Sequence, residues 1–184
     1  MLTPLKNELA LIIDHELLTL TELVLAAAPS CFWHMPAATT GKYHPAISLG
    51  EGGLIRHTKA VVRLTAHLLA MNGIDEIQPE YSLAIAAAIL HDCCKKADNE
   101  KYTAFDHPRR AADLIRREAE FMPASFPRAT AAALASIVEC HMGRWNVNAR
   151  TGECLPRPLT PLQRLVHCAD YLASRKDITL ADIS

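Results

Sequence analysis

Six residues of metal-binding types lie at positions where the hydrophobic pattern of the chain predicts buried helix faces. Burying an imidazole or a carboxylate without a partner costs several kcal/mol. These side chains must therefore pair with one another or coordinate metal. Neutral imidazoles and carboxylates together suit Fe, Mn, Ni or Zn, with Mg as an alternative. The six are His57, His91, Asp92, His107, His141 and Asp170.

The number of candidate ligands indicates more than one ion. Four histidines and two aspartates exceed what a single tetrahedral ion needs. Two ions with Asp92 bridging them is the economical arrangement. Two ions about 3.5–4 Å apart would activate a water molecule and hold a phosphoryl group during in-line displacement. The residue types therefore predict two divalent transition-metal ions and phosphoryl-transfer chemistry.

Five predicted helices carry these residues, and each residue lies on or beside an apolar stripe with helical period. His57 continues the stripe of Leu54 and Val61, and His141 extends that of Leu134 and Val138. The pair His91-Asp92 ends the most apolar helix, which is apolar all round and is therefore expected at the centre. The predicted ranges are 54–71 with an Asn72-Gly73 cap, 80–94, 106–120 with Asp106 as the cap, 128–141, and a last helix from the Thr160-Pro161-Leu162-Gln163 capping box.

A further helix is predicted over 5–28, followed by an irregular segment over 29–53 that is rich in Pro and Gly. The loop 144–159 lies between the last two helices, and no convincing strand pattern is present. The expected fold class is all-α, a compact bundle of about six helices. We expect one domain over residues 1–184, with a core at about 44–176 and the helix 5–28 packed on it.

Composition excludes several functional classes. The chain has 184 residues, 50% of them hydrophobic, and a net charge of −1, so no large nucleic-acid surface is expected. Asp14, Glu16 and Glu22 interrupt the apolar N-terminal stretch, which argues against a signal peptide and against a membrane partner. The six cysteines lack C-x-x-C spacing, and reduced thiols in a cytoplasmic protein are the simple interpretation.

Three segments resemble motifs of the HD-domain superfamily of metal-dependent phosphohydrolases, whose ligands run His…His-Asp…Asp on successive helices. Residues 52–58 (GGLIRHT) look like the GGLLxHT segment of its exoribonuclease and relaxase-associated branches. Residues 91–95 (HDCCK) match HDxxK, and residues 169–172 (ADYL) match the closing Asp motif. His107 and His141 match the two extra histidines of binuclear members. The resemblance covers about residues 44–176.

The resemblance implies an HD-domain helical fold and a role for each candidate residue. All six would ligate metal, and Asp92 would also orient the attacking hydroxide. Lys95 would hold a substrate phosphate as a point charge. Arg144 and Arg56 are further candidates for substrate binding, and Arg109 and His44 are weaker ones. The implied reaction is cleavage of a phosphate ester or anhydride, by metal-activated hydroxide, in a phosphorylated small molecule such as a nucleotide or in a short oligonucleotide.

Other readings of the same ligand set stay open. A di-iron oxygenase branch uses the same pattern of four histidines and two aspartates. A non-catalytic module that binds metal or nucleotide for regulation is a further alternative, although an intact ligand set argues against it. The cyclic-dinucleotide phosphodiesterase branch has a His-His pair where this chain has His141-Met142. A nuclease is a variant of the hydrolase reading.

Overall fold

The computed structural model describes residues 3–38 and 44–178, and α-helices dominate it. Within these ranges the single β-type pairing is an isolated bridge between Val147 and Cys154, so the all-α prediction is confirmed. In chain order the elements are η1 (Thr3–Leu5), α1 (Lys6–Leu9), α2 (His15–Ala27), η2 (Ser30–Trp33), η3 (Ala46–Ser48), α3 (Gly53–Met71), α4 (Pro79–Leu90), α5 (His107–Ala119), α6 (Arg128–Glu139), η4 (Gly143–Trp145) and α7 (Pro161–Ala173).

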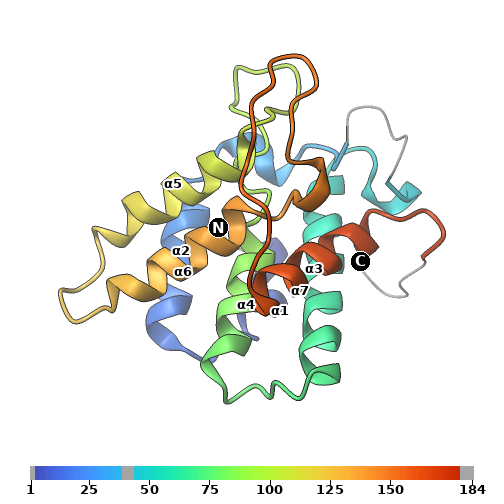
Figure 1. Ribbon diagram of the computed structural model, residues 1–184. Helices are drawn as coiled ribbons and strands as arrows, with labels where there is room; N and C mark the ends of the chain where they lie inside the picture. Colours follow the sequence, from blue (N-terminus) through green and yellow to red (C-terminus); the bar gives the residue numbers. More distant parts are fainter. Residues whose placement is uncertain (1–2, 39–43, 179–184) are drawn as a thin grey trace.

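Helix α4 occupies the centre of the molecule, as its uniformly apolar sequence predicts. It packs against α2, α3, α6 and α7, and all of its residues except Pro79, Glu80 and Leu83 are buried. Figure 1 shows α4 between α3 on one side and the neighbouring pair of α5 and α6 on the other. Ala and Ile dominate α4, and small side chains allow several helices to approach it closely.

Two helix boundaries follow the local signals in the sequence. Helix α3 ends at Met71, and Gly73 adopts a left-handed φ of 71° that a residue with a Cβ rarely adopts. Helix α7 starts with the predicted capping box, in which the Thr160 side chain accepts from the Gln163 backbone N–H while the Gln163 side chain accepts from the Thr160 N–H. Both predictions are confirmed.

The single N-terminal helix predicted over 5–28 is wrong, because the chain breaks between α1 and α2. The Asp14 carboxylate caps α2 by accepting from the Leu17 N–H at 3.0 Å. Ser82 of the central helix accepts from the N–H groups of Ile13 and Asp14 at 3.2 and 3.4 Å. A contact 68 residues away in sequence therefore satisfies the backbone at the break.

Two details of the other helices also differ from expectation. Helix α4 ends at Leu90 rather than Cys94, and residues 91–94 form tight turns. Asp106 precedes α5, but its side chain does not cap the helix. Its carboxylate instead forms an ion pair with Arg110 one turn later at 2.9 Å. Such an ion pair competes with helix capping for a carboxylate at the start of a helix.

The helices bring several of their ends to one region. The C-terminal end of α4 at Leu90 and that of α6 at Glu139 meet the N-terminal end of α5 at His107, and α3 and α7 pack side by side next to them. None of the described helices has both the length and the continuous apolar character that crossing a membrane requires.

Candidate metal centre

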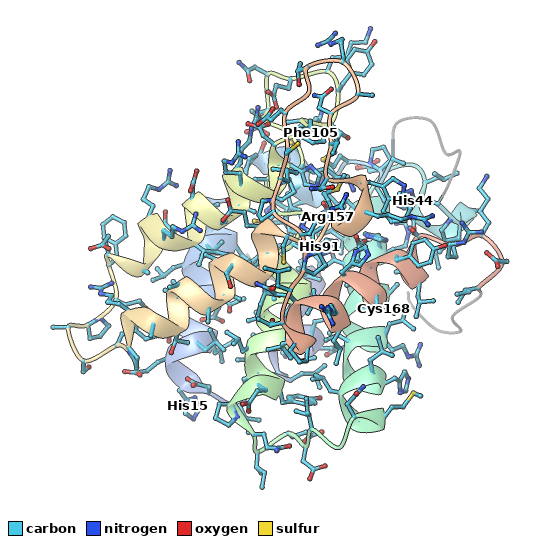
Figure 2. All side chains as sticks on the ribbon, viewed as in Figure 1. His15, His44, His91, Phe105, Arg157 and Cys168 are labelled. Carbon is cyan, nitrogen blue, oxygen red and sulfur yellow. The ribbon has the colours of Figure 1, made fainter. Side chains whose placement is uncertain are left out.

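The structure brings all six predicted ligands into one buried cluster made of two triads. Within each triad, one ligand atom from every residue lies within 4.8 Å of the others, a spacing that could hold a metal ion. The four imidazoles and Asp92 are almost completely buried. Figure 2 labels His91, which is fully buried, near the centre of the view. The first triad is His57, His91 and Asp170, and the second is Asp92, His107 and His141.

Asp92 belongs to the second triad, and its carboxylate approaches the histidines of both triads. Its Oδ1 is 3.0 Å from Nε2 of His107 and 3.6 Å from Nε2 of His141. Its Oδ2 is 3.4 Å from Nε2 of His91 and 4.0 Å from Nε2 of His57. A carboxylate with one oxygen directed at each triad has the arrangement of a bridging ligand.

Three of the four histidines are oriented by a backbone carbonyl three residues earlier. A carbonyl oxygen can only accept, so Nδ1 of each ring carries the proton and Nε2 presents a lone pair to the cluster. Such contacts fix the tautomer and orientation of metal-binding histidines. The pairs are His91 with Ala88 at 2.8 Å, His107 with Ala104 at 2.7 Å, and His141 with Val138 at 2.7 Å.

The location of these histidines at helix ends explains why the carbonyls are available. Carbonyls at a helix C-terminus lack a partner within the helix. His91 directly follows α4, and His141 lies just past the end of α6. His107 starts α5, where Pro108 has no N–H to offer the Ala104 carbonyl. His57 lies within α3, and its buried Nδ1 accordingly has no hydrogen-bond partner among the described residues.

The lone pairs make the cluster unfavourable unless something positive enters it. Nε2 of His107 and Nε2 of His141 are 3.2 Å apart, although both rings carry their proton on Nδ1. Nε2 of His91 faces Asp92 and, at 3.7 Å, Oδ1 of Asp170, and no described group hydrogen-bonds to it. Facing lone pairs and carboxylates repel each other, so the donor set fits divalent cations.

The ionisation states of the two carboxyls and of His57 and His107 suit metal binding. Burial opposes charge on Asp92, but Lys95 and His91 outweigh it and hold the pKa of this carboxyl well below its usual range. Burial also opposes charge on Asp170, whose side chain is 22% exposed, but its hydrogen bond from His57 at 3.0 Å lowers its pKa. Burial lowers the pKa of His57 and of His107, which favours the neutral imidazole that ligates a metal.

Lys95 and His44 border the cluster. The Lys95 ammonium lies 2.5 Å from Oδ2 of Asp92, and its side chain is 11% exposed. The His44 ring packs edge-on against His57 with centroids 5.2 Å apart. Burial lowers the pKa of His44 to about 4, so this ring is neutral at physiological pH. Lys95 therefore lies beside Asp92, and His44 lies beside the first triad.

The predicted phosphate-binding arginines have other contacts. Arg56 donates through Nε to the Ile47 carbonyl at 2.6 Å and through Nη2 to the Leu49 carbonyl at 2.9 Å. Arg144 is exposed, with its Cζ 4.5 Å above the Trp145 ring. Arg109 pairs with Glu153. Contacts of these arginines with substrate stay predictions.

Sequence reasoning missed the support beneath His141. His167 donates from Nδ1 to the His141 carbonyl at 2.7 Å. The ring fits only because residue 143 is glycine: a Cβ there would lie 2.1 Å from Cε1 of His167. Trp145 follows, stacked on Tyr171 with centroids 5.4 Å apart. The available signal was position, because Gly143 lies two residues after His141 and His167 lies three residues before Asp170.

We expect Gly143→Ala to destabilise the fold by about 2 kcal/mol more than Gly152→Ala. Both glycines have positive φ, 57° and 74°, so both variants incur the same backbone strain. A Cβ at Gly152 meets nothing within 4 Å, whereas one at Gly143 displaces the His167 ring. Urea unfolding of both variants measures the difference. Equal destabilisation of the two variants would show that displacing the His167 ring does not reduce the stability of the fold.

Comparison with known proteins agrees with this geometry. The family model described as "HD domain" matches residues 54–175, about two thirds of the chain. The matched range begins in α3 and ends just after α7, so it includes all six cluster residues. Searches of curated proteins and of solved structures found no match.

Proposed function

Because the chain belongs to the HD-domain family, whose members are mostly metal-dependent hydrolases, we propose that it is a phosphohydrolase. Its substrate would be a nucleotide or a short oligonucleotide, in which it cleaves a phosphate ester or anhydride. The observation that carries the proposal is the buried Asp92 carboxylate, which approaches all four imidazoles and also contacts a lysine ammonium.

The cluster residues would hold two divalent transition-metal ions, with Fe, Mn, Ni and Zn as candidates and Mg as an alternative. Bound there, the ions would supply Lewis-acid polarisation of the phosphoryl oxygens and an activated water. The protein's own contribution is the fixed direction of the Nε2 lone pairs, which the backbone carbonyls impose on three of the rings. The burial of the cluster excludes bulk water and strengthens every charge interaction inside it.

Lys95 would act on the substrate as well as on Asp92. Its ammonium keeps the Asp92 carboxylate ionised, and its partly exposed side chain can reach a phosphate oxygen that carries growing negative charge. Arg144 would add a second cation on the side of His141. The near-neutral net charge supports a small substrate rather than a long nucleic acid, because long nucleic acids are bound mainly through many phosphate contacts.

We expect Lys95→Met to lower kcat/KM for the preferred substrate roughly 10²-fold while the metal content stays unchanged. Methionine keeps the length and apolar stem of the side chain and removes only the charge. Lys96→Met is the matched control, because Lys96 donates to the Glu100 carbonyl instead of to the cluster. Steady-state kinetics and elemental analysis of both variants check this. Loss of metal from Lys95→Met would instead assign Lys95 to the support of Asp92 alone.

The proposed function is tested by product release from a panel of substrates. The protein is stripped of metal and reloaded with Mn or Ni, then incubated with nucleotides, dinucleoside polyphosphates and short oligonucleotides. Release that depends on the added metal supports the phosphohydrolase, and the preferred substrate defines its class. If protein that holds two irons releases no product, that result would favour the di-iron oxygenase. If protein that binds no metal releases no product, that result would favour a regulatory binding module.

A further inference from the structure

A cavity of about 490 Å³ opens beside the metal centre, and the phosphohydrolase chemistry does not use it. One wall is the segment 44–49, which contains η3. The opposite wall is the end of α7 with the residues that follow it, represented by Leu172, Ala173 and Ile178. Ala60 of α3 contributes between them. Cavities of this size hold small organic ligands.

The cavity adjoins the metal centre through His44. This residue lines the cavity, and its ring also packs against the ligand His57. On the opposite wall, Leu172 and Ala173 follow the ligand Asp170 within one helical turn of α7. A molecule whose phosphate lies at the cluster could therefore place its remaining part in the cavity.

The lining selects an uncharged and largely apolar group. Ile47, Leu49, Leu172 and Ile178 present aliphatic side chains, and a charged group among them would lose its hydration without compensation. The small side chains of Ala60 and Ala173 leave space between the walls. Nδ1 of His44 is buried and has no hydrogen-bond partner among the described residues, and a turn of this ring toward the cavity that it lines would offer Nδ1 to a polar ring atom. Lys176 also lines the cavity with an exposed side chain that can remain in solvent.

We propose that this cavity is the base-binding subsite of the enzyme, and that it takes the nucleobase of a nucleotide whose phosphate lies at the metal cluster. The inference rests on the proposed phosphohydrolase function and defines its substrate class further. A nucleobase is flat, uncharged and carries ring nitrogens at its edge. It therefore matches two aliphatic walls and one free imidazole nitrogen better than a second phosphate or a sugar chain does.

The test fills the cavity from its outer wall. Ile47 is 40% exposed, so Ile47→Trp adds bulk at the cavity without burying a new side chain in the core. Ile77→Trp is the matched control, because Ile77 is 85% exposed and lies beyond the other end of α3. Both variants are loaded with metal and compared on the preferred nucleoside monophosphate and on glycerol phosphate, an ester without a base. Metal content and thermal unfolding confirm that the variants are intact.

Ile47→Trp is expected to lower kcat/KM for the nucleoside monophosphate roughly tenfold or more, and to leave glycerol phosphate hydrolysis unchanged. Ile77→Trp should alter neither. Equal losses on the two esters, or no loss on either, would overturn the base-binding subsite. A preference for octyl phosphate over every nucleotide would overturn it too, because the cavity would then take an alkyl chain.

A binding measurement separates failure of this inference from failure of the proposed function. The four common ribonucleosides carry no phosphate, so their affinity for the metal-loaded protein is measured by calorimetry independently of hydrolysis. Binding that weakens in Ile47→Trp but not in Ile77→Trp would support the subsite even if no ester is cleaved. Ester cleavage without any nucleoside binding, or with binding that Ile47→Trp leaves unchanged, would support the hydrolase and reject the subsite.

Discussion

Replacing Asp92 by alanine is expected to lower kcat/KM for the best substrate roughly 10³-fold and to release the bound metal. Among the described residues, Asp92 is the one that approaches all four imidazoles, so both triads lose an anionic oxygen at once. The ammonium of Lys95 would also lose its partner at 2.5 Å and remain partly buried. The effect on activity should therefore exceed that of any change to the surrounding cations.

Elemental analysis after dialysis and steady-state kinetics measure this effect. Asp92→Asn is examined beside Asp92→Ala, because it keeps the size of the side chain and removes its charge. Asp113→Ala is the surface control, since Asp113 pairs with Arg116 on the surface and its side chain is 65% exposed. Full metal content and activity in Asp92→Ala would reject the assignment of this cluster as the active site.

Substituting alanine for Gly53 is expected to destabilise the protein by about 3 kcal/mol or more. A Cβ at Gly53 would lie 2.3 Å from the carbonyl oxygen and 2.7 Å from the carbonyl carbon of Ser48, and 3.2 Å from Cα of Pro36. All three are backbone atoms, so no side-chain rotation can relieve the contact. Alanine normally favours a helix over glycine by about 1 kcal/mol, which makes the expected sign diagnostic of the clash.

Urea unfolding of Gly53→Ala and Gly73→Ala measures the contribution of this close approach. Gly73 lies at the opposite end of α3, and a Cβ there meets nothing within 4 Å, although its φ is positive. The free energy of unfolding of Gly73→Ala should therefore fall only by the cost of the backbone strain. Metal affinity should fall as well in Gly53→Ala, because α3 carries His57 one turn later. A variant as stable as the parent would mean that the 48–53 backbone moves aside freely.

The helices that the sequence predicts well are those whose signals are local. The capping box at Thr160 and the glycine after Asn72 act within a few residues, and both boundaries follow them. The break before α2 depends on Ser82, and no local pattern contains that information. The Asp106 carboxylate forms an ion pair with Arg110 instead of capping the N-terminus of α5. These two contacts have similar energies and compete for the same carboxylate.

The cluster was predictable because a buried polar side chain needs a partner wherever it lies. Apolar stripes interrupted by His57 or His141 are visible without coordinates, and the HD-type spacing completes the set. The hydrogen bonds that hold the segments around the cluster in place were not predictable, because they depend on distances across the fold. His167 beneath the His141 carbonyl and Arg56 bonded to the 47–49 backbone are both of this kind.

The distribution of the candidate ligands along the chain has a consequence for the stability of the protein in a cell. His57 and Asp170 are 113 residues apart, so an ion held by both closes a loop that spans most of the chain. An ion that binds only the folded state, at a free concentration about a hundred times its Kd, adds about 2.7 kcal/mol to the free energy of unfolding. Metal starvation would then shorten the half-life of this protein as well as abolish its activity. The abundance of the protein would follow the supply of its own metal cofactor.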